Sequence, residues 1–151
     1  MNLAITNDTW RKIWNFVLFQ IGWFACILGA AHQQMTLALG ISALCIAVYL
    51  WLRSNAWIEY KLLIKVFLFG LVADTVLLQL AWLQFESPFP SSVISPAWMW
   101  ALWVLFATTL KESMSWMQGK NTLAVVLGAI AGPLCYEAGV RLGAAQWASP
   151  E

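Results

Sequence analysis

The sequence predicts an all-α, polytopic membrane helix bundle with five transmembrane helices, on the basis of three observations. First, 62% of the 151 residues are hydrophobic and only 10% are charged, whereas an ordinary soluble domain has roughly 25% charged residues. Second, five apolar segments follow one another with short polar breaks between them. Third, one threading of these segments places nearly all lysines and arginines on the same side of the membrane.

The five predicted spans form a single membrane-embedded domain. A helix needs about 20 apolar residues to cross roughly 30 Å of hydrocarbon. The segments that meet this requirement are residues 13–31, 35–52, 62–85, 97–117 and 122–144. The break before the fourth span, "ESPFPSSVISP", is rich in proline and serine, and Pro96 is well placed at a helix start.

Positive charges orient the predicted spans, because cytoplasmic loops carry an excess of lysine and arginine. With the N-terminus in the cytoplasm, seven of the eight basic residues fall on the cytoplasmic side: Arg11, Lys12, Arg53, Lys61, Lys65, Lys111 and Lys120. Only Arg141 lies near the other face. An odd number of spans then places the C-terminus outside, on the opposite side of the membrane.

The first segment could alternatively be a secretory signal, since Arg11 and Lys12 precede an apolar run that ends in "GAA". A signal has an apolar region of about 7 to 15 residues. This run is longer and contains Asn15, Gln20 and Gly22. We therefore expect it to remain as a span, with its small residues and these amides facing inward.

Asp74 stands near the middle of the third predicted span. The fifteen Leu, Ile, Phe and Val residues of 62–85 favour insertion by about 4 to 9 kcal/mol, against a cost of about 3 kcal/mol for aspartate. The segment is therefore expected to insert. Ionisable groups inside a membrane are functional candidates. The alternative is structural: protonation neutralises the carboxyl group, and Thr75, Gln79 or a buried amide elsewhere satisfies it.

The fifth predicted span carries the other charged candidates, Glu137 and Arg141. Their spacing of four places them on one helical face. One hypothesis is that they join Asp74 in a cluster, and the alternative is that they neutralise one another near the outer interface. Tyr136 and the deep-lying Trp23 and Trp103 complete the polar and aromatic candidates, although core packing is the commoner use of a buried ring.

Two GxxxG spacings lie in the same span, formed by Gly128 with Gly132 and by Gly139 with Gly143. Such spacings let another helix approach closely. Pro133 frees a backbone carbonyl and is expected to bend the helix. The span is therefore expected to present a packing face.

The sequence offers no signature of catalysis, metal binding or nucleic-acid binding. The net charge is +1, the three cysteines stand singly, and the one histidine, His32, has no companion. These features predict no metal, no cofactor and no nucleic-acid partner. Lys111 and Glu112 are adjacent and so point apart on a helix, which favours solvated boundary positions for both.

Three stretches together resemble a family of small bacterial inner-membrane proteins catalogued as a domain of unknown function. They are "NFVLFQIGWFACILGA", "WMWALWVLFATTLKESMSWM" and "GAIAGPLCYEAGVRLGA". With "ADTVLLQL" around Asp74, the resemblance covers nearly the whole chain. It implies a polytopic protein with no assigned activity or functional residue, and a link to the modification of membrane fatty acids.

The function expected from these observations is non-enzymatic binding of a lipid or another apolar small molecule, or an accessory role to a membrane enzyme. Asp74, Glu137 and Arg141 would be the polar anchors of an aromatic-lined cavity. The alternatives are a small transporter or proton-coupled channel that uses Asp74, and a subunit of a membrane enzyme. The expected partners are the lipid bilayer, an apolar ligand, and a second copy or an enzyme subunit.

Overall fold

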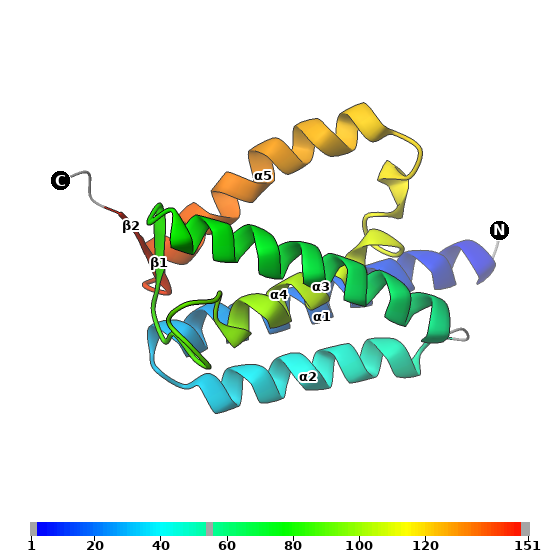
Figure 1. The fold of residues 1–151 in the computed structure, drawn as a ribbon. Coiled ribbons are helices and arrows are strands. Elements are labelled where there is room, and N and C mark those ends of the chain that lie inside the picture. The colour runs from blue at the N-terminus through cyan, green and yellow to red at the C-terminus, as the bar shows by residue number, and fades with distance from the viewer. Residues whose placement is uncertain (1–2, 54–55, 149–151) are drawn as a thin grey trace.

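The computed structural model describes residues 3–53 and 56–148, which form five α-helices, one short 3₁₀ helix and a small sheet. The helices are α1 (Leu3–Ala31), α2 (Met35–Trp51), α3 (Ala56–Gln79), α4 (Ala97–Leu110) and α5 (Asn121–Arg141). The 3₁₀ helix η1 (Ser115–Met117) precedes α5, and the strands are β1 (Leu83–Phe85) and β2 (Ala145–Trp147). Consecutive α-helices run in opposite directions (Figure 1). The predicted all-α class is confirmed.

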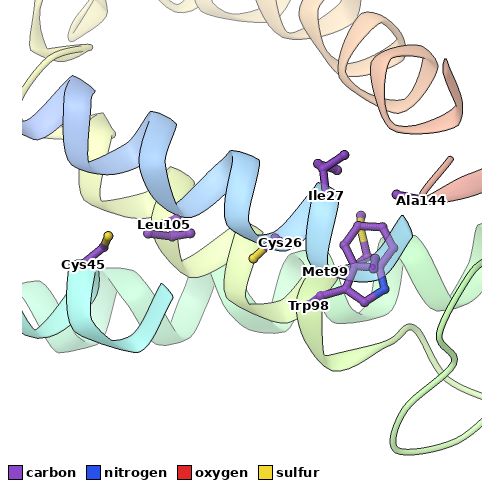
Figure 2. Close-up of a cluster of buried hydrophobic side chains, with 8 residues drawn as sticks. Cys26, Ile27, Cys45, Trp98, Met99, Leu105 and Ala144 are labelled. Atoms are coloured by element: carbon purple, nitrogen blue, oxygen red, sulfur yellow. The ribbon is translucent and has the colours of Figure 1, made fainter. Parts of the chain in front are cut away.

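Helices α1 to α4 pack into one body, and α4 lies in its middle. α1 packs against both α2 and α4, and α3 packs mainly against α4. The apolar core includes Cys26 and Ile27 of α1, Cys45 of α2, and Trp98 and Leu105 of α4 (Figure 2). The core therefore runs along α4 and includes the second half of α1.

Small residues let these helices approach closely. A side chain added at Gly22 would overlap Leu105 of α4, and one added at Gly29 would overlap Ala38 of α2. Asn15 and Cys26 on the same helix are buried as well. The predicted inward face of the first span is thus confirmed.

The third predicted span ends earlier than expected. We predicted a helix to residue 85, but α3 stops at Gln79, and Ala81 turns the chain with a positive φ of 54°. Residues 83–85 instead form β1, which pairs antiparallel with β2, so that Leu83 lies opposite Trp147. The apolar side chains at 80–85 suit a strand as well as a helix, and the pairing with residues 145–147 decides between them.

The fourth and fifth predicted spans are also longer than the observed helices. α4 ends at Leu110 rather than at residue 117, and the chain continues through turns and η1. α5 ends at Arg141 rather than at residue 144, and Gly143 has a φ of 82° that terminates the helical path. At the other end of the chain, α1 begins ten residues before the predicted start at residue 13.

Three of the helices are long and apolar enough to cross a membrane. They are Asn7–Ala31, Trp57–Gln79 and Asn121–Arg141, whereas α2 and α4 are shorter apolar helices. Large apolar side chains such as Leu44, Phe69, Val72 and Val125 are exposed on the outside of the molecule. Soluble monomers rarely expose such continuous apolar surface, so the outer surface agrees with a membrane environment.

α5 stands apart from the other helices over most of its length (Figure 1). Its main contacts are with η1 and β2, at its two ends. Only 6% of the most apolar stretch of the helix is buried inside the molecule. No described residue of this chain packs against Gly128 or Gly132, because a side chain added at either glycine would meet no atom within 4 Å, so the packing face expected there stays a prediction. Gly139, in contrast, lies close to Ile27 of α1.

Candidate functional site

The Asp74 carboxyl group is the most deeply buried acid of the described chain, with 0% of the residue exposed. It accepts one hydrogen bond from the indole Nε1 of Trp103, at 2.7 Å, and a second from the Tyr136 hydroxyl. These donors come from α4 and α5, whereas Asp74 belongs to α3. The carboxyl group therefore joins three helices at one point, which we call the Asp74 centre (Asp74, Trp103 and Tyr136).

Gly70 makes room for the Asp74 centre. It lies one turn before Asp74 on α3, and a side chain added there would overlap the Trp103 ring. With no side chain at this position, the indole lies across α3 and aims its N–H at the carboxyl group. Sequence reasoning did not single out Gly70, although a glycine one turn before a membrane aspartate is a signal of close approach.

Aromatic rings continue from the Asp74 centre along the side of α3 and α4. The Trp103 ring stands edge-on to Phe69, at a centroid distance of 5.6 Å, and edge-on to Phe106, at 6.1 Å. Phe69 is 65% exposed, and the other two rings are half-buried. We call these three rings the aromatic wall (Phe69, Trp103 and Phe106), and the Phe69 side of it is exposed.

The other polar neighbours of Asp74 on α3 have different partners. The Thr75 hydroxyl accepts a hydrogen bond from the backbone N–H of Ser95 at 3.1 Å, and the Gln79 amide donates to the Val93 carbonyl at 2.5 Å. Both bonds attach the end of α3 to the segment before α4. The alternative in which Thr75 or Gln79 satisfies Asp74 is therefore not what the structure adopts.

Glu137 and Arg141 form an ion pair with each other at 2.7 Å. The Trp147 indole N–H also donates to Glu137, at 2.8 Å, which connects α5 to β2. Their side chains are 38% and 78% exposed, and no ion pair joins Arg141 to Asp74 within residues 3–53 and 56–148. The geometry thus matches mutual neutralisation near the end of the bundle rather than a cluster of all three.

The remaining predicted candidates lie on α1. Asn15 is buried, donates to the Thr108 carbonyl at 3.1 Å and accepts from the Ser113 hydroxyl at 2.8 Å, so it ties α1 to the end of α4. Gln20 is half-buried. Trp23 is half-buried, packs against the apolar core and stands edge-on to Phe24.

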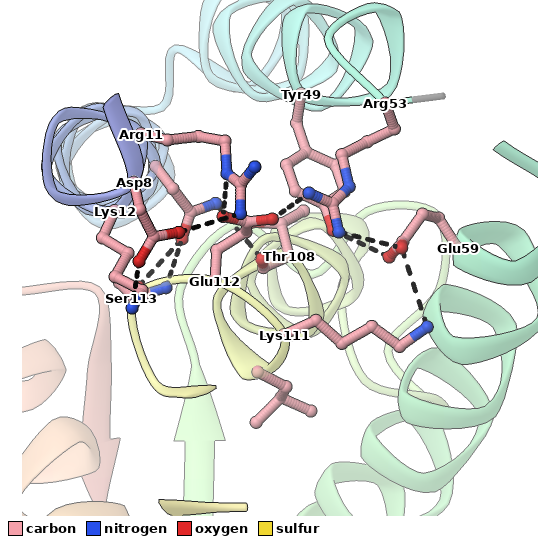
Figure 3. Close-up of polar contacts among 12 residues, drawn as sticks. Asp8, Arg11, Lys12, Tyr49, Arg53, Glu59, Thr108, Lys111, Glu112 and Ser113 are labelled. Carbon is pink, nitrogen blue, oxygen red and sulfur yellow. Dashed lines mark hydrogen bonds and ion pairs between the residues drawn. The ribbon is translucent and has the colours of Figure 1, made fainter. Parts of the chain in front are cut away.

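Sequence reasoning missed a second group of polar residues, which we call the ionic cluster: Arg11, Arg53, Glu59, Lys111 and Glu112 (Figure 3). Glu112 pairs with Arg11 at 2.9 Å and with Arg53. Glu59 pairs with Arg53 at 3.2 Å and with Lys111 at 3.6 Å, and accepts a hydrogen bond from Tyr49. The ionic cluster connects α1, α3 and the ends of α2 and α4.

The predicted solvated position of Glu112 is therefore wrong, because its side chain is only 2% exposed, whereas the Lys111 side chain is 30% exposed, in agreement with a boundary position. Adjacent residues do point apart, as expected, but each finds a partner on a different element. The sequence does contain a pattern that could have predicted the ionic cluster. Arg11, Arg53, Glu59 and Glu112 lie at the same predicted end of four different spans. Opposite charges that share one end of a membrane bundle favour pairing.

Two shallow grooves on the surface of the described residues lie apart from the Asp74 centre. One shallow groove of about 450 Å³ lies on α2, and another of about 360 Å³ lies beside residues 87–90. Neither is lined by Asp74, Trp23 or Trp103. Within residues 3–53 and 56–148, no group of three histidine, cysteine or acidic side chains could hold a metal ion.

The chain matches no curated protein and no solved structure. The model of one family, described as "Protein of unknown function (DUF2878)", matches residues 12–151. That match includes the Asp74 centre and all but Arg11 of the ionic cluster, so the chain belongs to the DUF2878 family.

Proposed function

We propose that this protein crosses a bacterial inner membrane five times, with the N-terminus in the cytoplasm and the C-terminus in the periplasm. The antiparallel course of successive helices supports this topology (Figure 1). So does the charge distribution, because seven of the eight basic residues lie near the ends of helices that would face the cytoplasm.

α2 and α4 are the two helices whose lengths need an explanation in this topology. Their 17 and 14 residues span about 26 and 21 Å at 1.5 Å per residue, less than the roughly 30 Å of hydrocarbon. α4 is surrounded by α1, α2 and α3. Irregular backbone at membrane depth is tolerated where protein encloses it, which fits the turns that follow Leu110.

Within this topology, the protein acts as a non-enzymatic binding or accessory protein for a lipid or another apolar molecule. The binding region is the aromatic wall of Phe69, Trp103 and Phe106 beside α5. The observation that carries this proposal is the Asp74 carboxyl group, fully buried, at the point where an otherwise exposed α5 meets α3. Binding sites for apolar molecules combine apolar walls with a few polar groups of this kind.

Purification and thermal unfolding in mild detergent test this function. Fatty acids, phospholipids and quinones are added singly to the wild type, to Asp74→Asn and to a control, Glu137→Gln. We expect at least one of these compounds to raise the Tm of the wild type and of the control more than that of Asp74→Asn. Equal stabilisation of all three proteins by every compound would contradict a role for Asp74 in binding.

A transport role makes a different prediction, which separates it from simple binding. In proteoliposomes, a proton-coupled carrier would show a flux that Asp74→Asn abolishes. A binding or accessory protein shows no such flux. Mass spectrometry of lipids and proteins that co-purify with the chain then distinguishes ligand binding from an accessory role to a membrane enzyme.

A further inference from the structure

Lys61 and Lys65 on α3 are exposed cations that pair with no acidic side chain among residues 3–53 and 56–148. The other basic residues of the chain, apart from Lys120, form ion pairs: Arg11, Lys12, Arg53, Lys111 and Arg141. No ion pair involves Lys61 or Lys65 in the part of the chain that the structure describes, and both are exposed. Their positive charge is therefore available to an external anion.

The two lysines share one face of α3, since they are four residues apart. Residues at this spacing have Cβ atoms about 5 to 6 Å apart on a helix surface. Two ammonium groups at that spacing can both donate hydrogen bonds to one phosphate group. The pair thus matches a phosphate better than either lysine does alone.

Trp57 lies one turn earlier on the same face and marks the depth of this position. The Lys61 Nζ lies 5.4 Å from the centroid of the Trp57 ring, and that ring is 69% exposed. Exposed tryptophans favour the level of the lipid headgroups. The Lys61 ammonium group is therefore expected at the depth where phosphates lie. Lys65 lies about 6 Å further along the helix, and its long side chain can extend back toward that level.

The same face continues as an apolar surface beyond Lys65. Leu68, Phe69, Val72 and Val76 are all exposed along it. From Lys65 to Val76 the helix rises about 16 Å at 1.5 Å per residue, and one leaflet has about 15 Å of hydrocarbon. The face thus combines cations at one end with an apolar length that matches one acyl chain.

We propose that this face of α3 binds an anionic phospholipid, with the headgroup phosphate between Lys61 and Lys65 and an acyl chain along Leu68, Phe69 and Val72. Charge complementarity selects an anionic lipid, because two cations without acidic partners attract a net negative headgroup more than a zwitterionic one. This site shares Phe69 with the aromatic wall but includes no residue of the Asp74 centre, and its headgroup contacts at Lys61 and Lys65 do not depend on the function proposed above.

Native mass spectrometry of the full chain in detergent tests this site. The protein is titrated with phosphatidylglycerol, with phosphatidylcholine of the same acyl chains, and with inorganic phosphate. The test variant is Lys61→Gln with Lys65→Gln. The control is Lys12→Gln with Lys120→Gln, which removes the same charge at the same end of the bundle but leaves the α3 face intact.

We expect the wild type and the control to bind phosphatidylglycerol more tightly than phosphatidylcholine. The test variant should lose about 30-fold in affinity for phosphatidylglycerol, because each lysine near an anionic surface contributes about 1 kcal/mol and each 1.4 kcal/mol is tenfold. Lys61→Arg with Lys65→Arg should retain binding, because arginine keeps both positive charges.

Three results would overturn the proposal. Equal losses in the test and control variants would show a general charge effect rather than a site. Equal binding of phosphatidylglycerol and phosphatidylcholine would remove the role of the anionic headgroup. Binding of inorganic phosphate with the same affinity as the lipid would show an anion site that makes no use of the apolar face.

Discussion

The Tyr136 hydroxyl of α5 donates a hydrogen bond to the Asp74 carboxyl group of α3, across 62 residues of sequence. α5 has few other contacts with the body of the molecule between its two ends. The bond therefore fixes the C-terminal third of α5 to the bundle, while the part before it remains exposed. Changes at this bond should act mainly on the position of α5.

Tyr136→Phe removes that bond and should loosen α5. A lost hydrogen bond to a buried partner costs about 1 to 3 kcal/mol, which corresponds to roughly 5- to 150-fold in a local opening equilibrium. We expect the amides of residues 121–141 to exchange with deuterium faster by about this factor. Hydrogen exchange with mass spectrometry in detergent measures it, and the amides of α2 should keep their wild-type rates.

Cys135→Ser serves as the control for that experiment, because it changes the neighbouring residue, which is exposed on α5. It should leave exchange in α5 unaltered. If Tyr136→Phe and Cys135→Ser gave the same rates, the bond to Asp74 would not be what holds α5.

Gly70→Ala should destabilise the protein, because the added methyl group overlaps the Trp103 ring. Either α3 and α4 separate or the indole moves away from Asp74. Gly40→Ala on α2 is the matched control, since a side chain there meets no atom within 4 Å and alanine favours a helix by about 0.5 to 1 kcal/mol over glycine. Thermal unfolding should show a lower Tm for Gly70→Ala and an unchanged or higher Tm for Gly40→Ala. If Gly70→Ala had the same Tm as the wild type, the contact between Gly70 and the Trp103 ring would not be tight.

The positions of the helices could be predicted from the sequence to within a few residues at several ends, because hydropathy is a local property. α2 was predicted as 35–52 and is observed as Met35–Trp51. The ends that were wrong depend on distant partners instead. The end of α3 is set by the pairing of Leu83–Phe85 with Ala145–Trp147. The hydropathy of residues 80–85 carries no information about that distant partner.

The polar residues show the same division between local and distant information. The Glu137–Arg141 pair could be predicted from their spacing of four on one helix. The partners of Asp74 could not, because Trp103 and Tyr136 lie 29 and 62 residues away, and periodicity does not choose which helices are neighbours. The ionic cluster was missed for the same reason, since its five residues come from four helical regions.

Fusions to topology reporters should alternate along the chain if it crosses the membrane five times. We expect reporters after residues 32, 89 and 148 to be periplasmic and reporters after residues 53 and 119 to be cytoplasmic. The reason is the excess of lysine and arginine near one set of helix ends. Paired enzyme and fluorescent-protein fusions measure this directly, and a cytoplasmic reporter after residue 89 would contradict the topology.

Glu112→Gln should destabilise the protein far more than Glu137→Gln, although each change removes one carboxylate from an ion pair. Glu112 is buried between Arg11 and Arg53, whereas Glu137 pairs with a largely exposed Arg141. Removing one partner of a buried pair costs about 3 to 5 kcal/mol. Arg11 is 59% exposed, so water can hydrate it when its partner is removed. We therefore expect Glu112→Gln to lower the free energy of unfolding by about 2 to 3 kcal/mol, at or below the lower end of that range.

Unfolding by sodium dodecyl sulfate, followed by circular dichroism, measures the free energy of unfolding of both variants. Glu137→Gln should be indistinguishable from the wild type, because an ion pair between exposed side chains contributes little in water. If the two variants lost the same stability, the ionic cluster would not be what holds α1, α2 and α3 to the end of α4. If Glu112→Gln is destabilised and Glu137→Gln is not, the double variant of Glu112→Gln with Arg53→Gln provides a further check. Its loss of unfolding free energy should be smaller than the sum of the losses in the two single variants, because Glu112 and Arg53 share one interaction.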